Sequence, residues 1–209
     1  MYNGQNKIEI CSQTEAFPSG FGFGCVGLPP HPHHTEGIGA MEQEQYTIYR
    51  KEEIYHLLEE KKIRYEAMEH PAVYTMEDME QYHITEKGTV CKNLFLRDAK
   101  GKNHFLVTVP NARKVDLKEL GQKIGCSKLS FASADRLEKY LHVQQGCVSP
   151  FGLLNDESKS VTLIVDADLK REQHMGIHPN DNTASVWLAF RDLEELIEEH
   201  GNEVMLVKF

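Results

Sequence analysis

The chain has 209 residues, of which 40% are hydrophobic and 26% are charged, and its formal net charge at pH 7 is −9. These values are ordinary for a globular protein of one domain, and the acidic balance argues against indiscriminate nucleic-acid binding. No run approaches the roughly 20 apolar residues of a membrane-spanning helix, so no membrane partner is expected.

The negative charge is unevenly distributed along the chain. Between Lys87 and Lys128 about ten basic residues face only about three acidic ones, so this segment is strongly positive. An acidic protein with one basic region still binds a polyanion locally. The alternative is a solvated, lysine-rich face without a partner.

Residues 1–40 differ from the rest because they are rich in Gly, Pro and His and show no period of 2 or 3.6. They predict a flexible leader, either native or introduced with an expression vector, and Met41 is a candidate natural start. The "HPHH" run at 31–34 has no fixed geometry, so no specific metal site is expected there. Residues 41–209 are expected to form one domain.

Regular patterns begin near Tyr46. In chain order they predict a helix at 51–63, a strand at 64–70, a helix at 75–82, a hairpin at 91–110, helices at 115–125 and 133–143, a strand at 160–169, an apolar strand after Thr183, a helix at 191–201 and a strand at 201–209. Thr75 is the expected N-cap of its helix, and Gly101 is expected to supply a positive φ in the hairpin turn. Helices mixed with hairpins, without strict β-α-β alternation, predict an α/β (α+β) fold with a mixed sheet.

Common catalytic signatures are absent from the sequence, including G-x-S-x-G, the P-loop, H-E-x-x-H and the Rossmann glycine triplet. One remaining candidate is Lys92, which heads an apolar run. A lysine at that place is often an exposed edge residue that discourages aggregation. The functional alternative is a compact positive charge that holds a phosphate or ester oxygen.

His178 and the residues after it form a second candidate. Asn180, Asp181, Asn182 and Thr183 are ordinary turn-formers, and a histidine beside such groups could equally orient a substrate carbonyl.

The five cysteines of the chain are odd in number and scattered, which favours a reduced, cytoplasmic protein over a disulfide scaffold. Cys91 and Cys147 have no sequence neighbour that would activate them. Small buried cysteines are therefore expected rather than nucleophiles.

The stretch "GCVSPFGLLND" at 146–156 is a third candidate, because a connection between a helix and a strand is normally more polar. Gly146 and Pro150 either end the preceding helix or shape a pocket.

Four segments, "EHPAVYTMED", "CKNLFLRDAKGKNHFLVTVP", "GCVSPFGLLND" and "GIHPNDNTASVWL", occur in an order that resembles the YbaK/ProX family of aminoacyl-tRNA editing domains. Within that family the likeness is to the ProXp-ala/PrdX type, over about residues 46–209. The resemblance implies an α/β fold with a mixed, barrel-like central sheet surrounded by helices. It implies hydrolysis of the ester that joins a wrong amino acid to the 3′ adenosine of tRNA, without metal or organic cofactor.

The resemblance also assigns residues. It implies catalytic roles for Lys92, Gly146 and His178. It implies substrate-binding roles for Asn93, Cys147, Val148, Ser149, Pro150, Asn182 and Thr183. Val148, Ser149 and Leu153 are expected to form walls of the pocket.

The substrate implied by the resemblance is alanyl-tRNA(Pro), and the implied partners are the acceptor end of tRNA(Pro) charged with a small amino acid and prolyl-tRNA synthetase. The amino-acid pocket of the synthetase is built for proline and rejects the smaller alanine poorly, since each methylene is worth only about 1–3 kcal/mol. A second, hydrolytic site is therefore needed. Three alternatives stay open: a deacylase for cysteinyl-tRNA(Pro) or another aminoacyl-tRNA, a non-catalytic aminoacyl-tRNA-binding regulator, and a metal protein built on the histidines of the leader.

Overall fold

The computed structural model describes residues 47–126 and 128–209. The predicted leader and its histidines therefore lie outside the described residues. The helices are α1 Lys51–Glu60, α2 Met76–Gln81, α3 Leu117–Lys123, α4 Ala134–Leu141 and α5 Phe190–His200, with short 3₁₀ helices η1 Ile84–Glu86, η2 Pro150–Asn155 and η3 Ala167–Arg171. The strands are β1 Tyr65–Glu69, β2 Thr89–Asp98, β3 His104–Pro110, β4 Leu129–Phe131, β5 Val161–Asp166, β6 Met175–Ile177, β7 Ala184–Leu188 and β8 Val204–Val207.

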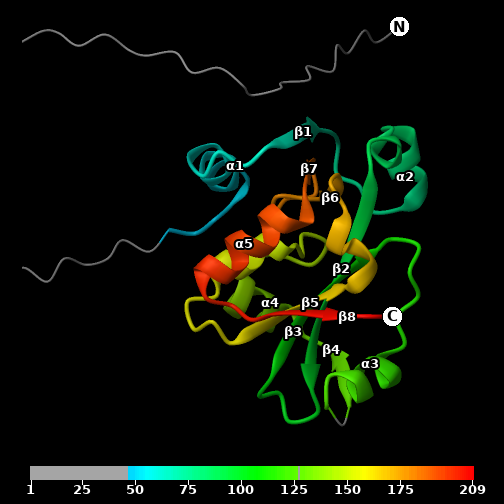
Figure 1. Cartoon of the computed structure of the whole chain (residues 1–209), viewed down its shortest axis with the longest axis vertical. Helices are drawn as coiled ribbons and strands as arrows, with labels where there is room; N and C mark the ends of the chain where they lie inside the picture. Colours follow the sequence, from blue (N-terminus) through cyan, green and yellow to red (C-terminus); the bar gives the residue numbers. More distant parts are fainter. Residues whose placement is uncertain (1–46, 127) are drawn as a thin grey trace, which may run out of the picture. The chain divides into compact units, whose positions relative to one another are not determined.

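The strands pair in one mixed sheet of eight, in the order β1-β7-β6-β2-β3-β5-β8, with β4 paired to β2 (Figure 1). The β2·β6, β3·β5 and β5·β8 pairs are parallel and the others are antiparallel. The predicted mixed sheet with surrounding helices is confirmed. Among the described residues the pairing ends at β1 and β8 and does not close into a ring.

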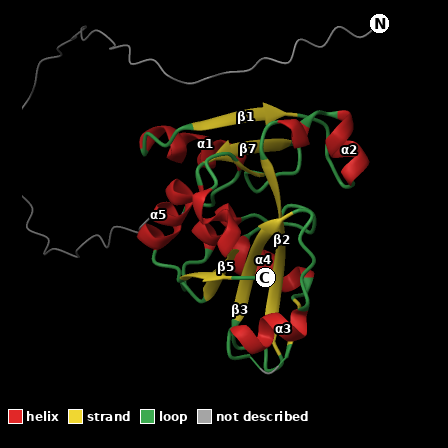
Figure 2. Ribbon diagram, turned by 45° about the vertical axis from the view of Figure 1, so that its right-hand side comes forward, coloured by secondary structure: helices red, strands yellow, loops and turns green. Residues whose placement is uncertain are grey.

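Strand β2 joins the two halves of the sheet. Its first residues, Thr89 and Val90, pair with β6, and the following residues pair with β3. In Figure 2 β1 and β7 lie at the top of the view and α3 at the bottom, with β2 between them. The place where β2 changes partners is also the place where the candidate site lies.

Strands β3 and β5 are buried on both faces, and their alternation separates two hydrophobic clusters. Leu106 and Leu163 face the cluster that holds α1, α4 and α5, whereas Val107 and Ile164 face the cluster under α3. Successive side chains of a strand point to opposite faces, so one near-continuous apolar run supplies both. These buried strands form the rigid base that supports the site.

Local signals explain several element boundaries. The Thr75 hydroxyl accepts a hydrogen bond from the Asp78 amide, as predicted for an N-cap. Gly101 has φ +66° in the hairpin turn, and Gly201 has φ +103° at the end of α5. Five elements, β4, β6, η1, η2 and η3, are missing from the sequence-based prediction, and the strand predicted at 160–169 is wrong at its end, because β5 stops at Asp166 and η3 follows.

Candidate active site

A cavity of about 360 Å³ lies where β2 pairs with β6, which in turn pairs with β7. Residues from segments far apart in the sequence line it. Among them are six of the residues predicted from the sequence: Lys92, Asn93, Gly146, Val148, His178 and Asn182.

The other predicted residues lie outside the cavity wall. Ser149 and Pro150 are buried, and the Ser149 hydroxyl accepts a hydrogen bond from the Phe151 amide as the N-cap of η2. Leu153 is fully buried in the core, and Cys147 packs against that core. The Thr183 amide and hydroxyl donate to the Asp181 carboxylate at 2.8 and 2.6 Å.

Lys92 lies on β2, and its ammonium donates to the backbone carbonyl of Asn111 at 2.9 Å. Both residues line the cavity. Lys92 is the one permanently charged side chain among the described residues that line the cavity, and no Asp or Glu belongs to that lining. The cavity therefore offers a single positive charge, which suits an anionic or developing negative oxygen.

Asn93 follows on the same strand, and its side-chain oxygen accepts from the Thr108 hydroxyl at 2.8 Å. The two residues are register partners of β2 and β3. This bond fixes the amide orientation so that the NH₂ group of Asn93 is the end left to donate elsewhere.

His178 is held neutral by its surroundings. Burial lowers its pKa to about 4, although the Asp181 carboxylate acts in the opposite direction. Its Nδ1 atom is buried and has no hydrogen-bond partner among the described residues. At pH 7 the imidazole is therefore a neutral polar wall of the cavity.

Gly146 has φ +91°, a conformation that residues with a Cβ rarely adopt. A Cβ at this place would meet Tyr74 Cε1 at 3.8 Å and Asn182 Nδ2 at 3.9 Å, which are ordinary contacts. The backbone conformation, rather than a lack of space, accounts for glycine here. Tyr74, 74% exposed, stands at the rim of the cavity.

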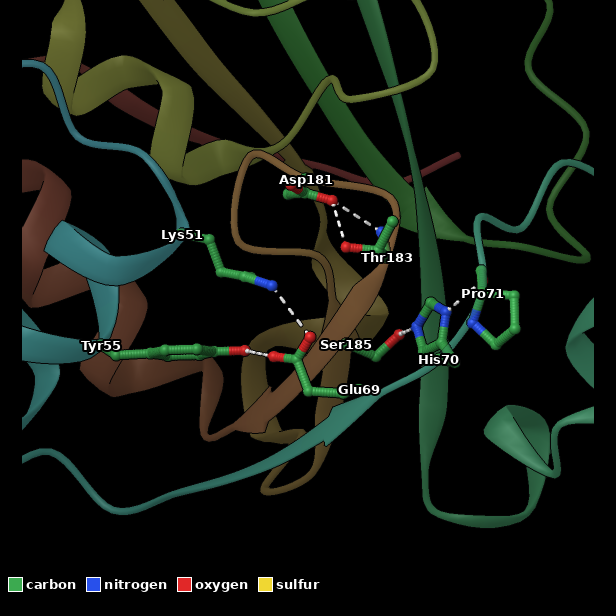
Figure 3. A network of polar contacts seen from close by, with 8 residues as sticks. All are labelled: Lys51, Tyr55, Glu69, His70, Pro71, Asp181, Thr183 and Ser185. Carbon is green, nitrogen blue, oxygen red and sulfur yellow. Dashed lines mark hydrogen bonds and ion pairs between the residues drawn. The ribbon is translucent and has the colours of Figure 1, made fainter. Parts of the chain in front are cut away.

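His70 and Ser185, for which no role was predicted, also line the cavity. His70 Nε2 lies 3.0 Å from the Ser185 hydroxyl, although the two residues are 115 positions apart (Figure 3). Both residues lie within motifs of the family resemblance, at 69–78 and 176–188, but the motifs do not indicate that the two side chains meet.

Helix α1 is tied to the same wall of the cavity through Glu69, the neighbour of His70. Lys51 Nζ contacts one carboxylate oxygen of Glu69 at 2.9 Å, and the Tyr55 hydroxyl donates to the other at 3.1 Å (Figure 3). Glu69 thereby raises the pKa of Lys51, mainly through this hydrogen bond. The network holds the end of β1, and with it His70, in a fixed position.

The described residues contain no group of three His, Cys, Asp or Glu side chains placed to hold a metal ion. None of the helices in the described part of the chain has the length and apolar character required to cross a bilayer.

Comparison with known proteins places the chain among aminoacyl-tRNA editing domains. Residues 70–196 match the family model described as "Aminoacyl-tRNA editing domain", and the chain belongs to that family. The resemblance inferred from the four sequence motifs is thus confirmed.

Two relatives show where the chain lies within the family. It is 49% identical to "Prolyl-tRNA editing protein ProX" of Acetoanaerobium sticklandii over 73% of this chain and 93% of the relative. It is 35% identical to "Prolyl-tRNA synthetase associated domain-containing protein 1" of Danio rerio over 76% and 87% of the two chains. A crystal structure provisionally described as a trans-editing enzyme for prolyl tRNA synthetase has the same fold, with a TM-score of 0.57, 20% identity and coverage of 75% of this chain and 94% of that one.

Proposed function

We propose that this chain is a trans-editing hydrolase that cleaves the ester of mischarged aminoacyl-tRNA, with alanyl-tRNA(Pro) as its substrate, to give free amino acid and tRNA. The observation that carries the proposal is the convergence of Lys92, Gly146, His178 and Asn182 on one cavity from three distant segments. Membership in the editing-domain family and the printed names of the relatives support the same reaction.

The proposed chemistry needs no strong nucleophile, because the ester of an aminoacyl-tRNA is already activated. Water held in attack geometry, or the neighbouring ribose hydroxyl acting as a base, supplies much of the rate through positioning. Backbone amides of the 146–152 loop are one candidate source of donors to the developing oxyanion, but those of Cys147 and Gly152 already donate to Gln144 and Ser149. We assign stabilisation of the oxyanion to the Lys92 ammonium, which has N–H groups beyond the one that Asn111 accepts.

The proposed selectivity comes from the apolar part of the cavity wall. Val73, Ile84, Val148 and Ile177 line it, and they suit a methyl side chain. Ile177 belongs to the buried core cluster and Val148 packs against it, so this part of the wall resists expansion, because protein interiors are close-packed. A pocket that receives alanine and excludes the proline ring would complete a double sieve.

The proposed tRNA contact uses the basic region 87–128, although part of its charge is neutralised internally. Arg113 pairs with Asp166 and Asp168, and Lys123 pairs with Glu119. The remaining lysines would meet the acceptor stem. We further propose prolyl-tRNA synthetase as a partner and the cytoplasm as the compartment, because the mischarged substrate arises there.

The test is deacylation by the purified protein of tRNA(Pro) charged with alanine, cysteine or proline. Release of alanine well above the spontaneous rate, with prolyl-tRNA(Pro) left intact, supports the proposal. Faster release of cysteine would instead assign the cysteinyl substrate. Binding of all three without turnover would indicate a regulator.

A further inference from the structure

An aminoacyl ester bound in the cavity needs a hydrogen-bond acceptor for its α-amino group. Such a substrate carries an α-amino group, which is a hydrogen-bond donor, and no Asp or Glu belongs to the described lining that would receive it. Resting on the proposed function, we infer that Ser185 Oγ accepts the α-amino group of the substrate and that His70 is the positioning residue that orients Ser185 for this task.

The hydrogen bonds of His70 fix the direction of the Ser185 hydroxyl. His70 Nδ1 lies 2.8 Å from the backbone oxygen of Pro71, which only accepts, so Nδ1 carries the proton of the neutral ring. Nε2 is then the acceptor, and the Ser185 hydroxyl 3.0 Å away donates to it. With its proton committed to His70, the Ser185 oxygen presents lone pairs and no donor to the cavity.

The His70 ring is itself rigidly held. It stacks on Tyr82 with an interplanar angle of 14° and a centroid distance of 6.5 Å. The His70 amide donates to the Thr183 carbonyl at 2.8 Å, and Glu69 before it is fixed to α1 (Figure 3). An acceptor whose direction is fixed before binding loses little entropy when the substrate arrives.

Other polar atoms of the lining are less suited to this role. Asn93 Oδ1 already accepts from Thr108, and the Asn111 backbone oxygen already accepts from Lys92. His178 Nδ1 is buried beyond the reach of a ligand. Asn182 is one competitor that these contacts leave open, and the experiment below includes it.

The test compares alanyl-tRNA(Pro) with N-acetylalanyl-tRNA(Pro), whose acetylated amine has lost its charge and gained bulk. We expect wild-type protein to prefer the free amine at least tenfold in kcat/KM. Ser185→Ala should raise KM for alanyl-tRNA(Pro) about tenfold and leave the N-acetyl substrate within about twofold, so that the preference collapses. Ser185→Thr keeps a hydroxyl and should retain most of the preference.

His70→Phe supplies the positioning test, because it preserves a ring against Tyr82 and removes the acceptor for Ser185. It should lower the preference for alanyl-tRNA(Pro) over N-acetylalanyl-tRNA(Pro) severalfold, again by raising KM for alanyl-tRNA(Pro). Ser130→Ala is the matched control, a half-buried strand serine on β4 outside the cavity lining, and it should leave both rates unchanged. Thermal unfolding of each variant checks that it folds.

Equal slowing of both substrates by Ser185→Ala in a folded protein would overturn the inference and indicate a role in the reaction itself. An unchanged preference in Ser185→Ala, or its collapse in Asn182→Ala alone, would overturn it as well. None of these results would contradict the proposed function. A wild-type protein that hydrolyses neither substrate would overturn both the inference and the proposed function.

Discussion

The Lys92 ammonium and the backbone carbonyl of Asn111 lie 2.9 Å apart and hold each other at the wall of the cavity. The bond fixes the one permanent charge of this lining without neutralising it, because a carbonyl carries only a partial charge. The position of this charge is the structural basis of the proposed reaction.

Replacement of Lys92 is the first test of that charge. Lys92→Ala should slow alanyl-tRNA(Pro) deacylation at least tenfold, because the oxyanion loses a charged donor worth about 2.7–4 kcal/mol in comparable sites. Lys170→Ala, an exposed lysine of η3 outside the cavity lining, is the control. Single-turnover rates measure both, and full activity in Lys92→Ala would remove the proposed role.

Gly146 and Gly125 form a matched pair for the second prediction. Both have positive φ, +91° and +72°, but Gly125 has no heavy atom within 4 Å of a Cβ and lies outside the cavity lining. Changing either to Ala should cost about 1–2 kcal/mol of stability, because the left-handed region disfavours a Cβ. Only Gly146→Ala should also slow deacylation, by about tenfold.

Urea unfolding and initial rates separate these two effects. Equal activity in the two alanine variants would show that Gly146 serves the fold alone and has no part in the site.

His178 should make stability depend on pH in the mildly acidic range. Its folded-state pKa of about 4 lies below the unfolded value of 6.5, so the unfolded chain takes up the proton first. Its contribution is fully present above pH 6.5 and is lost as pH falls toward 4. The loss amounts to as much as about 3 kcal/mol.

The free energy of unfolding, measured in urea between pH 4 and 7.5, checks this prediction. His178→Gln should flatten the curve, and the slope that remains should include His104, whose pKa burial also lowers. A His178→Gln curve parallel to that of the wild type would contradict the assignment.

Arg113 provides a prediction about the basic region. It donates to the buried carboxylate of Asp166 at 2.7 Å. Arg113→Ala should therefore clearly lower the midpoint of thermal unfolding, because it leaves that carboxylate buried without its cation. Lys118→Ala should instead leave stability within about 0.5 kcal/mol and weaken tRNA binding. Thermal unfolding and filter binding measure the two effects. A destabilised Lys118→Ala protein beside an Arg113→Ala protein as stable as the wild type would contradict these roles.

Local sequence patterns, which involve only neighbouring residues, predicted much of the fold. The hairpin at 91–110, the cap at Thr75 and the positive φ of Gly101 each depend on neighbouring residues, and the structure contains all three. Strand β4 has only three residues, too few for a pattern to emerge, and β2 supplies its pairing partner from a distance.

The apolar stretch 146–156 shows where sequence reasoning is ambiguous. Its lack of charge suggested a pocket wall, yet η2 is apolar chiefly because all six of its residues are buried in the core. Only Gly146 and Val148 of this stretch line the cavity. Burial against the core and exposure to a small apolar ligand favour the same residues, so composition alone does not separate them.

The pairing of His70 with Ser185 could not be predicted, because contact between residues 115 positions apart depends on the register of β1 against β7. The family motifs identified Lys92 and His178, but they say nothing about which neighbouring polar groups the fold adds.

The proposed selectivity is tested by the rate of amino-acid release when wild-type protein is mixed separately with alanyl-tRNA(Pro) and prolyl-tRNA(Pro). We expect rapid release of alanine and a prolyl-tRNA(Pro) half-life equal to that without protein. Release of proline as fast as alanine, or release of neither, would contradict it.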